Sequence, residues 1–123
     1  MKLDTTGKGL GAVFKEYQLS LIELLSQRDL TSGEGHAFIV EHGIRTTGKA
    51  RGPVSRATVI LFLNSLVDEG LVNYTEKTGK GGYARVYKKI DKQEFLERIM
   101  ERFVSKLNEI NQMETTGLFL RLK

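Results

Sequence analysis

The chain has 123 residues and no cysteine, so it has the length of one domain and can contain neither a disulfide nor a thiolate metal site. Its first residues lack the apolar core of a signal peptide, and its longest apolar run, VILFL at 59–63, is too short to span a membrane. These features predict a cytoplasmic protein with no membrane partner.

The positive charge is concentrated in the middle third of the chain. The net charge is +4, but residues 45–90 hold nine basic and three acidic residues, whereas segments 1–44 and 91–114 are each net negative. Such a distribution is typical of a surface that binds a polyanion, for example a nucleic acid.

Two helices are predicted in the first third of the chain. Segment 10–27 carries apolar residues at steps of three and four, and it forms either one helix or two with a restart at Ser20. Thr31 or Ser32 can cap a second, short helix that stops at Gly43. The predicted apolar face of the first segment consists of Leu10, Phe14, Tyr17, Leu21 and Leu24.

The clearest predicted helix covers residues 55–69, where Ser55 is a suitable N-cap and Gly70 a suitable residue to follow the helix. Its core face is predicted to consist of Val59, Phe62, Leu63, Leu66 and Val67. Its opposite face carries Arg56, Ala57, Ile60, Leu61 and Asn64. Ile60 and Leu61 either contact thymine methyl groups in a DNA groove or cover a neighbouring helix. Packing is favoured, because large apolar side chains usually pack.

A β-hairpin is predicted from the segments LVNYTEK and YARVYKK, which the five-residue loop TGKGG joins. This glycine–lysine run does not fit a nucleotide-phosphate loop, because Lys80 is followed by glycine and a strand instead of Ser or Thr and a helix.

His36 and His42 do not share a helical face, so we predict no metal site. No cofactor and no enzymatic activity are predicted.

A long helix is predicted to open at Asp91 and Glu94, which form a capping-box pattern, and to run to about Asn111. Its apolar residues follow a heptad spacing, while Phe95 and Ile99 form a second strip available to the rest of the domain. The heptad seam predicts a homodimer formed through Leu96, Met100, Phe103, Leu107 and Ile110. The tail TTGLFLRLK alternates apolar residues and could add a strand.

The predicted fold class is therefore mainly α with a small β-hairpin, in the order of a winged helix-turn-helix. Residues 10–90 are predicted to form this DNA-binding domain, and residues 91–123 a C-terminal dimerisation helix and a short tail.

The segments SRATVILFLNSLVDEGLV and GGYARVYKKIDKQEFLERIMERFVSKL resemble the penicillinase-repressor (BlaI/MecI) family of winged-helix transcriptional regulators. The resemblance covers roughly residues 19–108 and rests on three features. These are the Ser-x-x-Thr-Val start of the third helix, the Leu-x-x-x-Gly-Leu-Val passage into the wing, and the Val86-Tyr87 strand end that leads into the last helix. MarR-type regulators share the third helix and the wing.

The resemblance implies a homodimeric repressor of double-stranded DNA, with the third helix in the major groove and the wing on the backbone. Carried over by position, the groove-facing residues are Ser55, Arg56, Ala57, Thr58, Ile60, Leu61 and Ser65. At Ile60 and Leu61 this sequence departs from the family, which tends to have polar residues there.

Polar and basic residues of the loop before the third helix and of the hairpin are predicted to contact the DNA backbone. They are Arg45, Thr47, Lys49, Arg51, Lys77, Lys80, Tyr83 and Arg85. Three alternatives stay open: a MarR-like regulator that responds to a small-molecule effector, a winged-helix protein–protein interaction module, and a double-stranded RNA-binding protein.

Overall fold

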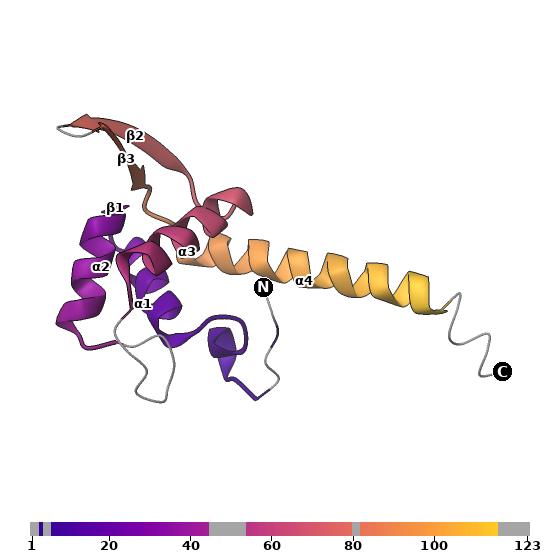
Figure 1. The fold of residues 1–123 in the computed structure, drawn as a ribbon. Coiled ribbons are helices and arrows are strands. Elements are labelled where there is room, and N and C mark those ends of the chain that lie inside the picture. The colour runs from indigo at the N-terminus through magenta and orange to yellow at the C-terminus, as the bar shows by residue number, and fades with distance from the viewer. Residues whose placement is uncertain (1–2, 4–5, 45–53, 80–81, 116–123) are drawn as a thin grey trace. The chain divides into compact units, whose positions relative to one another are not determined.

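The computed structural model of the protein describes residues 3, 6–44, 54–79 and 82–115. These residues form a mainly helical structure with a small three-stranded antiparallel sheet (Figure 1), so the prediction of a mainly α chain with a β-hairpin is confirmed at this level. The chain divides into an N-terminal unit, Met1–Ile90, and a C-terminal unit, Asp91–Lys123. In chain order the elements are η1 (Gly9–Ala12), α1 (Glu16–Leu25), β1 (Leu30–Thr31), α2 (Ser32–Glu41), α3 (Arg56–Asp68), β2 (Tyr74–Gly79), β3 (Gly82–Tyr87) and α4 (Lys92–Glu114).

The segment predicted as one or two helices forms a short 3₁₀ helix, η1, followed by α1. Helix α1 begins after Lys15, whose backbone N–H donates to Gln18 Oε1 at 2.8 Å. The alternative of a restart at Ser20 is therefore wrong. Ser20 lies inside α1, where its hydroxyl group donates to the carbonyl oxygen of Glu16 at 3.1 Å.

Helix α2 is fixed at its start by a reciprocal cap and in its middle by a close packing contact. The N–H of Glu34 donates to Thr31 Oγ1 at 3.2 Å, and the N–H of Thr31 donates to Glu34 Oε1 at 3.0 Å, as a capping box requires. The hydrogen bond from the Thr31 backbone, followed by those from the Thr31 hydroxyl group and the Arg28 guanidinium group, lowers the pKa of the Glu34 carboxyl group. A Cβ atom at buried Gly35 would lie 3.0 Å from Leu21 Cδ2. Glycine therefore lets α2 approach α1 closely.

The core of the N-terminal unit lies where α1, α2 and α3 meet. The ring of Phe62 meets those of Phe14 and Tyr17 edge-on, each at a centroid distance of 6.0 Å. Leu10 and Leu24 of the predicted apolar face of the first segment are only half-buried, as is Val67, which was predicted to be core. The buried side chains of the three α-helices are Tyr17, Leu21, Ile22, Leu25, Ile39, Val59, Phe62, Leu63 and Leu66.

The sheet has the order β1-β3-β2, so β3 is its central strand. Gly79 pairs with Gly82, which means that both strands extend into the segment predicted as a five-residue loop; that loop prediction is wrong. Gly82 has a φ of 114°, a conformation that favours glycine. Strand β1, which was not predicted, pairs through Leu30 and Thr31 with the end of β3.

Asp29 attaches the end of β3 to the turn between α1 and β1. Its Oδ2 lies 2.9 Å from Lys88 Nζ, and its Oδ1 accepts the backbone N–H of Lys89 at 2.7 Å. The hydrogen bond from the Lys88 ammonium group, followed by that from the Lys89 backbone, lowers the pKa of Asp29 below its ordinary value of 3.8.

Replacing Asp29 by Asn is expected to make the stability of the fold less dependent on pH in the acid range. Because the folded chain lowers the pKa of Asp29, the ionised carboxylate stabilises the fold above pH 3.8, and this contribution is lost as the pH falls through the lowered pKa. Glu34 titrates in the same direction, so part of the acid loss should remain in the variant. Urea denaturation from pH 6 down to pH 2, about the range in which carboxylates titrate, measures this. Equal acid losses in both proteins would contradict the prediction.

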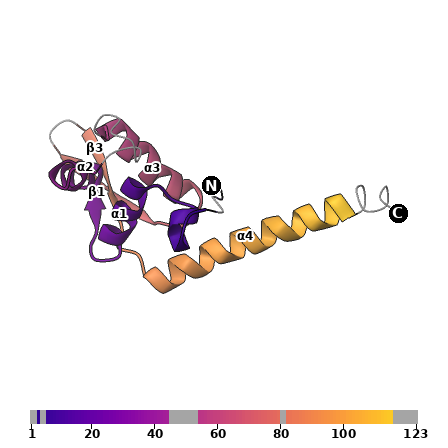
Figure 2. The same ribbon diagram turned by 90° about the horizontal axis from the view of Figure 1, so that it is seen from below.

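Helix α4 is a single unbroken helix (Figure 2). The side chain of Asp91 accepts the N–H of Glu94 at 2.9 Å, as predicted for the helix start, and the helix ends at Glu114 instead of near Asn111. The predicted tail strand lies outside the described residues from position 116 onward. Among the described helices, none combines the length and the apolar character needed to cross a bilayer.

Candidate nucleic-acid interface

Helix α3 has one buried face and one face open to solvent. The buried face carries Val59, Phe62, Leu63 and Leu66, which are between 0% and 6% exposed. Of the residues predicted to face a groove, Thr58 and Ile60 are half-buried. The exposed ones are Ser55, Arg56, Ala57, Leu61 and Ser65.

The first turn of α3 is held by its cap. Ser55 Oγ accepts the backbone N–H of Thr58 at 3.1 Å and lies 2.9 Å from Thr58 Oγ1. The guanidinium group of Arg56 lies over the start of α2, with its Nη2 3.6 Å from the place that a Cβ atom of Gly33 would take. The exposed cation therefore lies close to the N-terminal turns of α2 and α3.

Among the residues on the open face of α3, Leu61 differs most from its predicted environment. Its side chain is 71% exposed, so the favoured prediction that it covers a neighbouring helix is wrong within the described residues. Ile60 is half-buried, so its exposure lies between that of the core residues of α3 and that of Leu61.

Asn64 joins α3 to the hairpin. Its Oδ1 accepts a hydrogen bond from Tyr87 Oη at 2.6 Å and another from Arg85 Nη1 at 3.1 Å. Because arginine can only donate, the oxygen of the carboxamide must face it. The sequence places Asn64 on the open face, but it gives no signal for contacts to residues 21 and 23 positions away.

Arg85 is held by the hairpin as well as by α3. Its guanidinium carbon lies 4.1 Å from the ring centroid of Tyr74, the residue that pairs with Tyr87 across the strands. Burial raises the pKa of the Tyr87 phenol, while the positive charge of Arg85 acts in the opposite direction. Arg85, predicted to contact the DNA backbone, is thus a cation with a fixed orientation in the half of the hairpin nearer its base.

The outer part of the hairpin is exposed. Every residue of β2 is open to solvent, including Lys77, which pairs with Ala84. The backbone of Tyr83 pairs with Thr78, but the side chain of Tyr83 lies outside the described part of the structure. The other predicted backbone contacts, which also lie outside the described residues, are Arg45, Thr47, Lys49, Arg51 and Lys80.

Each of the two histidines contacts a backbone carbonyl group. His36 Nε2 lies 3.1 Å from the carbonyl oxygen of Val54, and His42 Nδ1 lies 2.9 Å from that of Phe38. The ring of His42 also lies 4.1 Å from the Phe38 ring. Among the described residues, no group of three or more His, Cys, Asp or Glu side chains could hold a metal ion.

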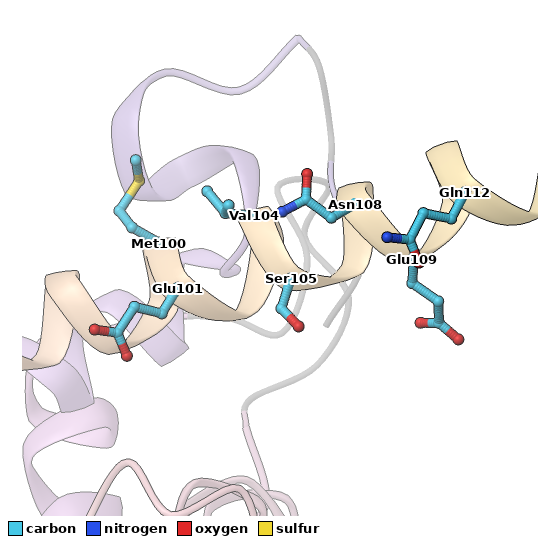
Figure 3. Close-up of a pocket in the computed structure, with 7 residues that line it drawn as sticks. All are labelled: Met100, Glu101, Val104, Ser105, Asn108, Glu109 and Gln112. Atoms are coloured by element: carbon cyan, nitrogen blue, oxygen red, sulfur yellow. The ribbon is translucent and has the colours of Figure 1, made fainter. Parts of the chain in front are cut away.

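Helix α4 presents a broad apolar face. Of the predicted seam, Leu96 and Phe103 are half-buried, while Met100, Leu107 and Ile110 are 62%, 60% and 46% exposed. Two residues outside the predicted seam, Val104 and Met113, are also more than half exposed. A shallow hollow of about 640 Å³ runs along α4 beside this apolar face (Figure 3). Its lining is Met100, Glu101, Val104, Ser105, Asn108, Glu109 and Gln112, all from α4.

A smaller cleft of about 300 Å³ lies between the start of α1 and the second half of α3. Phe14, Phe62 and Leu66 contribute its apolar walls. At its rim, Ser65 Oγ donates to the Phe62 carbonyl oxygen at 2.6 Å, and Gln18 Nε2 lies 3.2 Å from Tyr17 Oη. These bonds attach the polar groups of the rim to their own helices.

Comparison of the sequence with models of known protein families gave no match, and comparison with curated proteins gave no significant match. The candidate nucleic-acid interface is therefore defined by its own residues, which are the open face of α3 and the hairpin beside it. The apolar face of α4 is a separate candidate interface in the C-terminal unit.

Proposed function

We propose that the protein is a sequence-specific, double-stranded-DNA-binding transcriptional regulator of the winged-helix class, acting in the cytoplasm as a homodimeric repressor. Helix α3 lies in the major groove and the β2–β3 hairpin is the wing, which lies on the DNA backbone. The observation that carries the proposal is the open face of α3, with exposed Arg56 at its N-terminal end and a hairpin attached beside it through Asn64.

The charge and placement of these groups support duplex binding. Recognition helices contact bases mostly through their N-terminal residues, which here are Arg56 and Ala57, both exposed. Lys77 on the hairpin and the oriented guanidinium of Arg85 are suited to phosphate oxygens. The net charge of +6 in segment 45–90 favours association of this segment with a polyanion.

The homodimer is supported by the apolar face of α4. Leu107 and Met100, one heptad apart, are both at least 60% exposed, and a helix with such a face is stabilised by a partner helix. A symmetric dimer would bring two copies of α3 to a two-fold symmetric operator. This supports a regulator that occupies two half-sites.

Duplex binding measured at several salt concentrations tests the proposal. Selection from a random duplex pool supplies a bound sequence, and fluorescence anisotropy then gives its affinity between 50 and 300 mM salt, about the range in which phosphate contacts have large effects. We expect the affinity to fall steeply with salt, by about 0.9 log units per log unit of salt for each phosphate contact. A protein that binds no duplex, or binds with an affinity independent of salt, would refute duplex-specific regulation and favour a protein–protein module.

Two single variants separate base reading from phosphate binding. Arg56→Ala should weaken binding to the selected duplex more than binding to random duplexes, whereas Lys77→Ala should weaken both alike and lower the salt slope by about one. Lys8→Ala removes the same charge from an exposed position of the N-terminal unit and serves as the control. Identical profiles for all three variants would argue against the assigned roles. Equal affinity for double-stranded RNA would shift the proposal to that class.

A further inference from the structure

The apolar side chain of Leu61 has the highest exposure among the large apolar residues of the described chain. It lies in the middle of α3, on the face away from the core residues Val59 and Leu63. Ala57, one helical turn earlier, is also exposed, and Ile60 beside them is half-buried. These three residues form a narrow apolar strip along the open face of the helix.

Cationic groups lie near both ends of this strip. Arg56 is exposed at its N-terminal end, and Arg85 bonds to Asn64, which follows Ile60 by one turn. A narrow apolar strip between two guanidinium groups matches a major groove, because the floor of the groove carries thymine methyl groups and its walls carry phosphates. A protein-docking surface would instead present a wider patch with aromatic anchors and fewer charges at its centre.

We propose that Leu61 contacts the C5-methyl groups of thymines and thereby gives the protein a preference for thymine within each half-site. The inference rests on the proposed function, since it needs α3 to lie in the major groove. The inference specifies a property that the proposed function does not give, namely the base that the middle of α3 selects. Leu61 acts by excluding water from the methyl group, so that any base without a methyl at this place binds less well.

The test replaces thymine by uracil, which keeps base pairing and removes only the methyl group. In a duplex selected from a random pool, each thymine is replaced in turn, and affinity is measured by fluorescence anisotropy. With the wild-type protein, uracil at one position of each half-site should weaken binding about fourfold, the factor that one buried methyl-sized group contributes at room temperature. If no position is sensitive to uracil, the inference is overturned.

Variants of Leu61 connect the methyl effect to this side chain. Leu61→Ala should bind the thymine duplex about fourfold more weakly and should no longer distinguish uracil from thymine at that position. Leu61→Met, which keeps an apolar side chain of similar volume, should retain the discrimination. The control is Val40→Ala on α2, which shortens another exposed apolar side chain (53%) and should leave the uracil effect unchanged.

The outcomes separate this inference from the proposed function. If the wild type binds no duplex, the proposed function fails and the inference fails with it. If duplex binding is steeply salt-dependent but Leu61→Ala stays as sensitive to uracil as the wild type, the proposed function stands and the assignment to Leu61 is overturned. Thermal melting should give similar midpoints for both Leu61 variants, because the side chain is exposed.

Discussion

The double replacement Met100→Ser and Leu107→Ser is expected to convert the proposed dimer into a monomer and to weaken the proposed duplex binding by about a hundredfold or more. Both side chains are at least 60% exposed and lie one heptad apart on α4, so removing them deletes the centre of the apolar face. A monomer contacts one half-site at a time and loses the gain that two linked binding sites provide.

Sedimentation velocity at micromolar concentration measures the oligomeric state, and fluorescence anisotropy measures the affinity for the selected duplex. The matched control is Glu101→Ser with Arg102→Ser, two exposed neighbours whose charges cancel, so the net charge is unchanged and the number of serines is the same. The control should remain dimeric. A wild-type protein that is already monomeric, or a seam variant that stays dimeric, would show that this face is not the interface.

Replacing Asn64 by Leu is expected to lower the free energy of unfolding by about 2 kcal/mol, because a buried hydroxyl group loses its acceptor. Tyr87 is 2% exposed, and its hydroxyl donates to Asn64 Oδ1 at 2.6 Å. The same replacement releases Arg85, whose guanidinium then keeps its contact with Tyr74 but loses its bond to α3.

Urea denaturation at pH 7 measures this loss, and Asn64→Asp is the control. Aspartate keeps an oxygen that can accept hydrogen bonds from both Tyr87 and Arg85. Asn64→Asp should therefore lower the free energy of unfolding much less than Asn64→Leu does. In a Tyr87→Phe background the cost of Asn64→Leu should also shrink, because no hydroxyl group is then left without a partner. Equal costs for Asn64→Asp and Asn64→Leu, or a cost unaffected by Tyr87→Phe, would contradict the role assigned to the carboxamide.

The parts of the fold that could be predicted are those fixed by short-range chemistry. Ser55, Thr31 and Asp91 each cap a helix through the N–H three residues later, a contact that sequence spacing alone specifies. Gly43 and Gly70 follow helices with φ values of 63° and 74°, which few other residues adopt.

The parts that could not be predicted depend on contacts between distant segments. Strand β1 has two residues and exists because β3 lies beside it, so Leu30–Thr31 carries no periodic signal of its own. Leucine is usually buried, and a prediction from sequence has to assume this usual behaviour. The exposure of Leu61 contradicts that assumption. Asn64 looks like an ordinary polar surface residue until the hairpin folds back on α3.

The hairpin is supported unequally along its length, and this has a mechanical consequence. Strand β1 pairs with β3 at Val86 and Tyr87, whereas β2 pairs with it as far as Gly82. The hairpin is therefore held at its base and free at its outer end, and a force on the outer end bends it most strongly at its base. Tyr87 at the base and Arg85 two residue pairs further out bond to Asn64, so a force applied to the outer part of the hairpin is transmitted into helix α3.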